Sequence, residues 1–368
     1  MTEFPRTRRV VREALRSAVA PCAVAEIGDA RGVVWQDAAG NLTGHTSAPE
    51  ASPDTVFDLA SLTKVLATTT LAMRLVGAGA LDLAIRVAAV VPVWRRADRV
   101  DVTVADLLAH DSGLPAFAPL HRSCKTKQDF ERAICSVPLT HPPRSASVYS
   151  DLGFMLLGFV LERMVGAPLD VQFERMWEAL RVPGGADAPP RIDSAAEISF
   201  HPPAAWHERI APTRPSPAPP GVVHDENAAA LKGVAGHAGL FGSARAVGAL
   251  ARAMLRAVTG TEGGPVLASH ETAARFVTRV GTPGSSRALG WDTMLQTSSC
   301  GSRLSMRAFG HTGFTGTSLW IDPDAGLYFV LLANRVYPEV RSADGIGAFR
   351  RAFHDAAMMD WAFSNRAG

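Results

Sequence analysis

A serine and a lysine three residues apart, Ser61 and Lys64, are the residues of this 368-residue chain whose types and spacing most directly indicate chemistry. The proline-free, apolar run 65–80 follows them and predicts a buried helix. Ser61 would lie at its amino end, where free N–H groups favour an anion, with Lys64 one turn later on the same face. Serine needs a neighbouring base to become a nucleophile, and a desolvated lysine amine is one. An N-capping serine beside a solvated lysine would give the same pattern.

Lysine is rare in this chain. Of its 37 basic residues four are lysines, and the rest are arginines. A chain so biased towards arginine that keeps a lysine at position 64 favours a need for an amine that can lose its proton, which arginine cannot do.

Tyr149 and Asp151 form a second candidate group. The chain has only three tyrosines, and this one directly precedes an apolar helical pattern over 152–165. A phenol beside a protonated lysine has its ionised form favoured and can act as a general base. The alternative is a half-buried tyrosine that packs against a helix end, with Asp151 as the cap.

The run 310–317 is the third group and contains His311, Thr312 and Gly313. Glycines within a β-rich run indicate close approach of a ligand or of another backbone segment. One exposed N–H of this run could pair with that of Ser61 to hold an oxyanion. His311 could equally be an ordinary strand histidine.

A loop over 222–241 places His224, Asp225 and Glu226 close in sequence to His237. The spacing matches no helical metal-binding pattern, and adjacent acids point in different directions on a regular backbone. We therefore expect no metal and no cofactor, and we interpret the segment as a glycine-flexed loop that lines a pocket.

Composition bounds the class of protein. With 47% hydrophobic and 20% charged residues, the chain is globular and can bury a sizeable core. A net charge of +2 gives no argument for nucleic acid as a partner. The four cysteines lack C-x-x-C spacing, so they indicate no disulfide scaffold and no structural zinc, and they are compatible with a reducing compartment.

The amino-terminal residues 1–19 combine arginines with scattered apolar residues at helical spacing and lack the continuous apolar core of a signal peptide. They predict an amphipathic helix with a solvated basic face, and a membrane-surface role is the weaker alternative. No apolar run reaches the ~18 residues of a membrane span. We expect a cytoplasmic protein with no membrane partner.

Short β-prone runs near both ends of the chain predict the sheet. The runs 22–27 and 32–37 form one hairpin signal, and 307–322 with 327–334 form a second. Helical patterns lie between and after them, over 103–110, 152–165, 169–180, 244–258 and 345–361. The proline-dense stretch 183–221 is interpreted as a surface loop. The chain therefore predicts an α+β fold (α/β in the broad sense), with an antiparallel sheet built from both termini and a mainly helical insertion.

We expect one folded unit over residues 1–368. Its sheet part would comprise approximately 1–62 and 290–368, and its mainly helical part approximately 63–289.

Taken in order, the motifs Ser61-x-x-Lys64, Tyr149-x-Asp151 and His-Thr-Gly at 311–313 resemble the serine β-lactamase and penicillin-binding protein superfamily. The tyrosine-centred middle motif makes the chain similar to the class C-like branch, with its D-alanyl-D-alanine carboxypeptidases and esterases. The resemblance covers nearly the whole chain and implies the β-lactamase/transpeptidase-like fold.

The resemblance also implies roles for the motif residues. Ser61 would be the nucleophile acylated by substrate, and Lys64 would help to remove its proton. Tyr149 would be the base in acylation and would deliver the proton to the leaving group, while Asp151 would orient Lys64 or the substrate. His311 would neighbour Tyr149 from the edge strand. The oxyanion hole and further substrate contacts would come from Ser61 and Phe314 through their N–H groups, and from Thr312, Gly313 and Gly239.

Two positions depart from the β-lactamase pattern. Asp151 stands where β-lactamases usually have Asn, and a carboxylate there favours the charged form of Lys64 and shifts the role of base to Tyr149. His311 replaces a lysine, so the cation that attracts a β-lactam carboxylate is weakened. Both changes look like those of family members that act as esterases or peptidases.

These residues predict a serine hydrolase that works through an acyl-enzyme on Ser61. The expected substrate is a small-molecule carboxylic ester or amide without a strict need for a carboxylate, so the expected enzyme is a carboxylesterase. One alternative is an acyltransferase that resolves the same acyl-enzyme with an alcohol or amine. Others are a β-lactamase or D-alanyl-D-alanine carboxypeptidase, and a non-catalytic binding domain.

Overall fold

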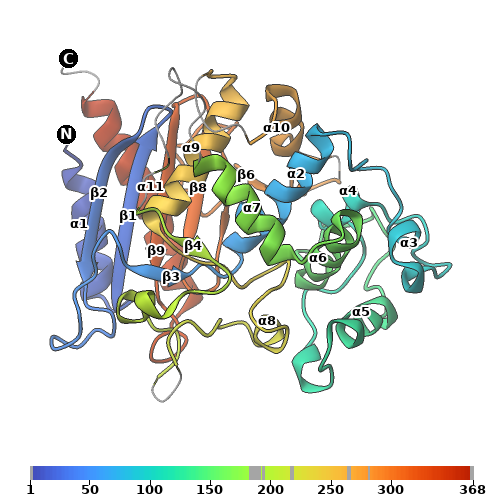
Figure 1. The fold of residues 1–368 in the computed structure, drawn as a ribbon. Coiled ribbons are helices and arrows are strands. Elements are labelled where there is room, and N and C mark those ends of the chain that lie inside the picture. The colour runs from blue at the N-terminus through green and yellow to red at the C-terminus, as the bar shows by residue number, and fades with distance from the viewer. Residues whose placement is uncertain are drawn as a thin grey trace.

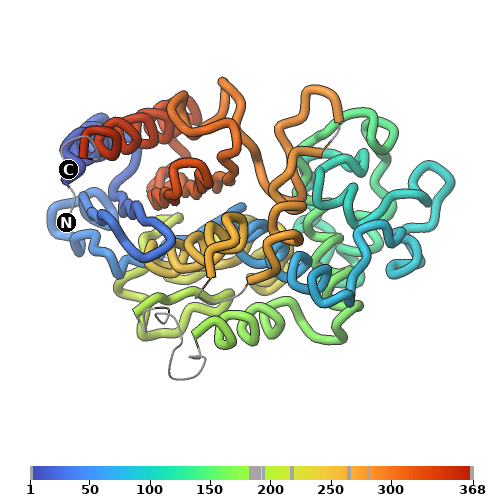
Figure 2. Tube along the Cα trace, turned by 90° about the horizontal axis from the view of Figure 1, so that it is seen from above, coloured from blue at the N-terminus to red at the C-terminus, as the bar shows by residue number. Residues whose placement is uncertain are grey.

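A six-stranded antiparallel sheet, drawn from both ends of the chain, organises the protein (Figure 1). The computed structural model describes residues 3–181, 192, 195–215, 219–262, 267–280 and 282–364. In spatial order the strands are β2 (Val33–Gly40), β1 (Cys22–Asp29), β9 (Leu327–Ala333), β8 (Ser318–Asp322), β7 (Phe309–Thr312) and β6 (Asp292–Thr293). Strand β1 pairs with β9, which places the two ends of the chain side by side (Figure 2). The predicted sheet from both termini is therefore confirmed.

Helices cover both faces of this sheet. On one face, α1 (Pro5–Arg16) packs against α11 (Ala343–Ser364), and on the other α9 (Ala244–Thr259) packs against β1 and β9. Helix α9 thus contacts the sheet although its residues fall within the range expected for the helical part. The division into two parts stays a prediction.

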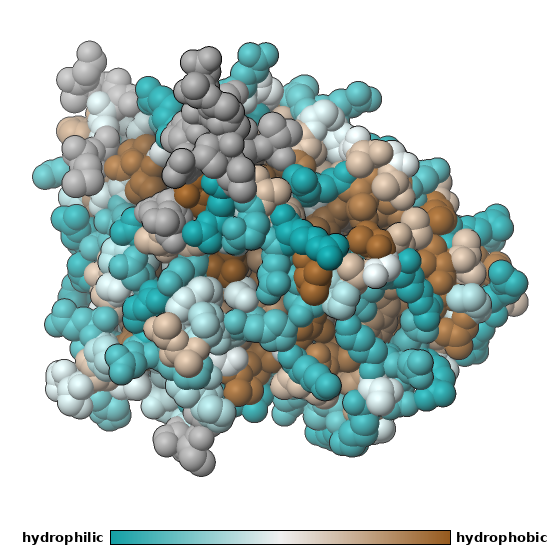
Figure 3. All heavy atoms as spheres, in the orientation of Figure 1, coloured by the Kyte–Doolittle hydropathy of each residue, from teal (hydrophilic) through white to brown (hydrophobic). Residues whose placement is uncertain are grey.

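The remaining helices lie beside the sheet and enclose a second, largely aliphatic core that is continuous with the α9 face. They are the π-helix η1 (Lys64–Thr69), α2 (Thr70–Gly77), α3 (Val87–Val90), α4 (Val104–Leu108), α5 (Lys127–Ser136), α6 (Asp151–Val165), α7 (Leu169–Arg181), α8 (Glu226–Ala230) and α10 (His270–Val277). Short 3-10 turns occur as η2 (Pro92–Trp94), η3 (Leu120–Arg122) and η4 (Ala204–Arg209). A small sheet of β3 (Val56–Asp58), β5 (Phe241–Ser243) and β4 (Ile198–Ser199) connects these helices to the large sheet. In Figure 3, hydrophobic residues gather on the visible face over this helical half.

Local sequence signals set several of these boundaries. Helix α4 begins after Thr103, whose hydroxyl accepts the Asp106 N–H while the Asp106 carboxylate accepts the Thr103 N–H, a reciprocal cap. Helix α6 ends at Val165, and Gly166 caps it with a positive φ of 70° that suits glycine. Within the described residues, no single helix is both long and apolar enough to cross a membrane. Helices α6 and α7 meet the length and composition required only when they are taken together, and the chain bends by 73° between them.

Strand β1 alternates between the two cores, and one of its buried positions is charged. Ala25 and Ile27 face the α1–α11 side, whereas Val24 faces α9. Glu26 is also buried and accepts hydrogen bonds from the Tyr328 hydroxyl (3.0 Å) and the Gln36 amide (2.8 Å). A Cβ at Gly248 of α9 would overlap the Glu26 carboxylate, so glycine is needed where this helix crosses the strand. Burial raises the pKa of Glu26 from 4.5 to about 7.

Glu26→Gln is expected to stabilise the protein at pH 8. Because the pKa of Glu26 is raised in the folded state, its contribution is most favourable below the unfolded pKa and is lost as the pH rises through about 7. A shift of this size corresponds to at most about 3 kcal/mol of unfolding free energy. Urea unfolding at pH 5 and pH 8 measures the effect, and the exposed Glu50→Gln is the control. Equal pH dependence in wild type and Glu26→Gln would contradict this assignment.

Candidate active site

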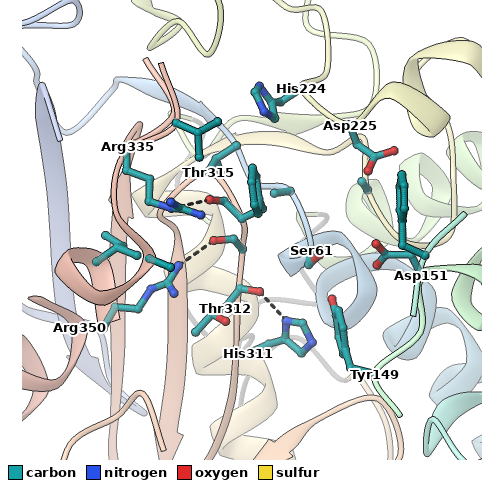
Figure 4. Close-up of a pocket in the computed structure, with 18 of the residues that line it drawn as sticks. Ser61, Tyr149, Asp151, His224, Asp225, His311, Thr312, Thr315, Arg335 and Arg350 are labelled. Carbon is teal, nitrogen blue, oxygen red and sulfur yellow. Dashed lines mark hydrogen bonds between the residues drawn. The ribbon is translucent and has the colours of Figure 1, made fainter. Parts of the chain in front are cut away.

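Ser61 lies where β3 meets the first helical turn, at the mouth of a cavity (Figure 4). The Asp58 carboxylate at the end of β3 accepts the N–H groups of Ala60 (2.9 Å) and His224 (2.6 Å), and Ala60 has a positive φ of 48°. Burial raises the pKa of Asp58 to about 6. These hydrogen bonds fix the turn that carries Ser61. They hold Ser61 at the amino end of the following helix, where the sequence predicts it.

The helix after Ser61 differs from the regular one that the sequence predicts. It begins as the π-helix η1, and regular α2 follows only from Thr70. The Thr70 hydroxyl donates to the Val65 carbonyl (2.7 Å), and the Thr68 hydroxyl donates to the Gly236 carbonyl (2.7 Å). One threonine hydroxyl thus takes up a carbonyl of the widened turn, and the other binds the turn to the loop at Gly236. Such turns are frequent at functional sites.

Lys64 is buried beneath the cavity, and its ammonium has three partners. Its Nζ lies 3.1 Å from Ser61 Oγ, 2.7 Å from Asp151 Oδ1 and 3.1 Å from the His237 carbonyl. Burial alone would lower the pKa of Lys64, but Asp151 and then Tyr149 raise it above its ordinary value. Lys64 is therefore a cation at neutral pH, as the Asp at position 151 predicts.

Tyr149 lies between two cations and two imidazoles. Lys64 Nζ is 4.9 Å from the centroid of its ring, and Arg287 Cζ is 5.0 Å from it. The rings of His110 and His311 have centroids 4.8 Å and 5.7 Å away. Figure 4 shows Tyr149 beside His311 and below Ser61. Both cations therefore lie close enough to interact with negative charge on the phenol oxygen.

Both histidines beside Tyr149 are neutral at pH 7. Burial, followed by the charges of Arg287 and Lys64, lowers the pKa of His110 and of His311 well below the ordinary value. His110 Nδ1 accepts the Ser150 N–H (3.0 Å), whereas His311 Nδ1 lies 2.8 Å from the Thr312 carbonyl and donates to it. His311 therefore supplies no cation where β-lactamases have a lysine.

The turn after β7 is bound directly to the segment before Ser61. The Thr315 hydroxyl donates to the Asp58 carbonyl (2.8 Å), and the Thr317 hydroxyl donates to the Leu59 carbonyl (3.1 Å). A Cβ at Gly313 would overlap Thr317 Oγ1 and the Leu59 carbonyl, so only glycine permits this approach. In the described part of the chain, the N–H groups of Ser61 and Phe314 donate to no protein acceptor.

The cavity has a volume of about 940 Å³ and brings most of the predicted residues together. Those that line it are Ser61, Tyr149, Asp151, His311, Thr312, Gly313 and Phe314. Gly239 does not line it, because its backbone is packed against the Gly233 carbonyl and Phe200, and Ala238 takes the place at the wall. The residue that precedes the expected one therefore lines the cavity.

The loop over 222–241 contributes a wall of the cavity. His224, Asp225, Glu226 and Ala238 line the cavity, and His237 Nε2 lies 2.9 Å from Asp225 Oδ1. Among the described residues, no three His, Cys, Asp or Glu side chains lie close enough to hold a metal ion.

Four arginines of the cavity wall were missed by the sequence reasoning. Arg214, Arg287, Arg335 and Arg350 all line the cavity, and their partners are carbonyl oxygens and aromatic rings. Within the described ranges, none of them forms an ion pair with a carboxylate. Arg214 comes from the proline-dense segment 202–220, of which residues 216–218 lie outside the described part. In a chain with so many arginines, only the fold distinguishes these four.

Comparison with known proteins agrees with this geometry. The sequence model of the family described as Beta-lactamase matches residues 7–351. The chain is 33% identical over 314 residues to an N-acetylmuramyl-L-alanine amidase of Bacillus subtilis, covering 78% of this chain and 69% of the amidase. It is 30% identical over 324 residues to a putative D-alanyl-D-alanine carboxypeptidase of Escherichia coli, covering 79% of this chain and 71% of the carboxypeptidase.

Solved structures share the fold at lower identity. EstCE1, a hydrolase with promiscuous acyltransferase activity, superposes with a TM-score of 0.74 at 22% identity, covering 96% of this chain and 98% of that one. The resemblance, the fold and the enzyme class inferred from the sequence are thus confirmed, and the chain belongs to the β-lactamase family of serine hydrolases.

Proposed function

We propose that this protein is a carboxylic ester and amide hydrolase that forms an acyl-enzyme on Ser61. The observation that carries the proposal is the contact between Ser61 Oγ and the buried Lys64 ammonium, with Tyr149 beside them at an open cavity. Ser61 attacks the substrate carbonyl carbon, while Tyr149, reacting as its phenolate, takes the serine proton and passes it to the leaving alcohol or amine. Water then attacks the acyl carbonyl and gives a proton to Tyr149, which passes it to Ser61 Oγ as the ester bond breaks and the carboxylic acid leaves.

In this mechanism Lys64 acts as a fixed cation. It holds Ser61 Oγ and is held in turn by Asp151 and the His237 carbonyl. Its charge stabilises the negative charge on the Tyr149 phenolate before proton transfer and on Ser61 Oγ during it. The N–H groups of Ser61 and Phe314 receive the negative charge on the substrate oxygen.

Three arginines of the cavity wall, Arg214, Arg287 and Arg335, favour a second candidate, an amidase or peptidase for substrates with a carboxylate. Cationic groups without acidic partners attract anions, and the low-dielectric walls of a cavity strengthen this attraction. The named activities of the amidase and carboxypeptidase relatives support this class. This candidate differs from the expectation, drawn from His311, that substrate needs no carboxylate.

Turnover of three substrate types by the wild-type protein, followed by intact mass and peptide mapping, tests the proposal. We expect hydrolysis of p-nitrophenyl butyrate, with a butyryl group on the peptide that contains Ser61. Faster turnover of N-acetyl-D-alanyl-D-alanine, reduced by added salt, would favour the second candidate. Rapid cleavage of a chromogenic cephalosporin would indicate a β-lactamase. Butyrate transfer to an added alcohol would indicate an acyltransferase. No turnover and no adduct would contradict the proposal and favour a binding domain.

A further inference from the structure

Arg350 reaches from α11 to the turn that carries the expected oxyanion donor. Its side chain is buried, with 8% of the residue exposed. A single nitrogen, Nη2, donates to the Gly313 carbonyl (2.7 Å) and to the Thr317 carbonyl (2.8 Å). In Figure 4 the strand segment with Thr312 lies between Arg350 and Ser61. The guanidinium therefore holds both ends of the turn from the side away from the nucleophile.

The charge of Arg350 has no counter-ion in the part of the chain that the structure describes. Its Nε is buried without a hydrogen-bond partner, and the charged group that acts on it most is another cation, Arg335. Burial, and after it Arg335, lowers the pKa of Arg350 to about 9, which leaves the group charged at neutral pH. Burying an unpaired cation destabilises a fold. Two neutral carbonyls could be satisfied without a charge, so the charge itself requires an explanation.

The position of the Gly313 carbonyl, the first acceptor of Arg350, explains why a charge is present there. The Gly313 carbonyl and the Phe314 N–H belong to the same planar amide. A cation on the oxygen of an amide draws electron density from the nitrogen, and hydrogen bonds in such chains strengthen one another. The Phe314 N–H, which no described acceptor takes, is thereby made a stronger donor. Thr315 and Thr317 fix the same turn against the carbonyls of Asp58 and Leu59.

We propose that Arg350 is a positioning residue of the oxyanion site, which orients and polarises the Gly313–Phe314 peptide so that its N–H receives the charge that forms on the substrate oxygen. The inference rests on the proposed acyl-enzyme chemistry at Ser61. Because that charge exists in the transition state and not in the bound ester, Arg350 contributes to the rate of acylation and little to ground-state binding.

Arg350→Met tests this inference, with Arg351→Met as the matched control because Arg351 is exposed on the same helix. We expect kcat/KM for p-nitrophenyl butyrate to fall about 10- to 100-fold, somewhat less than for loss of a whole oxyanion donor. Phenylboronic acid forms a tetrahedral adduct with an active serine, so its Ki should rise by a similar factor. Arg350→Lys should recover part of both losses, and Arg351→Met should change neither.

A purely structural role would lower the thermal unfolding midpoint without moving the boronic acid Ki in parallel with kcat/KM. Wild-type values of both parameters in folded Arg350→Met would overturn the inference. If Arg350→Met does not fold, Arg350→Gln, which keeps a donor and loses the charge, decides in the same way. Wild-type protein that neither hydrolyses the ester nor binds the boronic acid would overturn the proposed function instead.

Discussion

Ser61→Ala is expected to abolish ester hydrolysis, with kcat/KM reduced at least about 10⁴-fold. The substitution removes the only atom that the proposed mechanism acylates. The residual rate would come from the oxyanion donors and the cavity acting on bound water. Folding should be unaffected, because Ser61 Oγ accepts one hydrogen bond from Lys64, and Lys64 keeps Asp151 and the His237 carbonyl as partners.

Initial rates with p-nitrophenyl butyrate, together with intact mass after brief incubation, measure this effect. Ser145→Ala makes the same chemical change at an exposed serine outside the cavity and should behave as wild type. A thermal unfolding curve for each variant separates loss of chemistry from loss of fold. Ser61→Ala that retains more than a tenth of the wild-type rate would place the nucleophile elsewhere.

The sequence was sufficient wherever local rules decide the structure. Ser61 and Lys64 are three residues apart, so one helical turn brings their side chains together whatever the rest of the fold does. The hairpin of β1 and β2 and the capped start of α4 also depend on adjacent residues. The motif order then predicted that Tyr149 and His311 would join the pair, and their rings are 5.7 Å apart.

Features fixed by tertiary packing could not be predicted in this way. Arg350 lies on a helix more than 280 positions after Ser61, and nothing near it in sequence distinguishes it from the exposed Arg351 beside it. The choice between Ala238 and Gly239 at the cavity wall depends on how the loop packs against the Gly233 carbonyl. The π-helix after Ser61 likewise depends on contacts with the distant residue Gly236.

The charge on Lys64 decides how the proton moves. A lysine that serves as general base must first lose its proton, and Asp151 at 2.7 Å opposes that loss. The neutral histidines His110 and His311 could accept a proton in principle, but their burial, and after it the neighbouring cations Arg287 and Lys64, disfavours their charged forms. Tyr149 is the remaining candidate for the base, and the cations of Lys64 and Arg287 lie 4.9 Å and 5.0 Å from the centroid of its ring.

Tyr149→Phe is therefore expected to lower kcat/KM about 10³-fold while leaving the fold intact. The substitution removes the phenol oxygen and keeps the ring that packs against His110 and His311. Acyl-enzyme formation and hydrolysis should both slow, because the mechanism uses Tyr149 in each step. Stopped-flow measurement of the p-nitrophenol burst and of the steady state reports the two rates separately.

The matched control is Tyr328→Phe. Its hydroxyl donates to Glu26 in the buried sheet, and Tyr328 is not among the residues that line the cavity. Loss of this hydroxyl should therefore lower the unfolding free energy by about 1 kcal/mol and leave kcat/KM unchanged.

A comparison with Lys64→Met then distinguishes the two possible bases. If Tyr149→Phe keeps kcat/KM within tenfold of wild type while Lys64→Met loses about 10³-fold, Lys64 must take the serine proton itself. In that case Asp151 serves to position the amine, and Lys64, which is charged in the free enzyme, loses its proton when substrate binds.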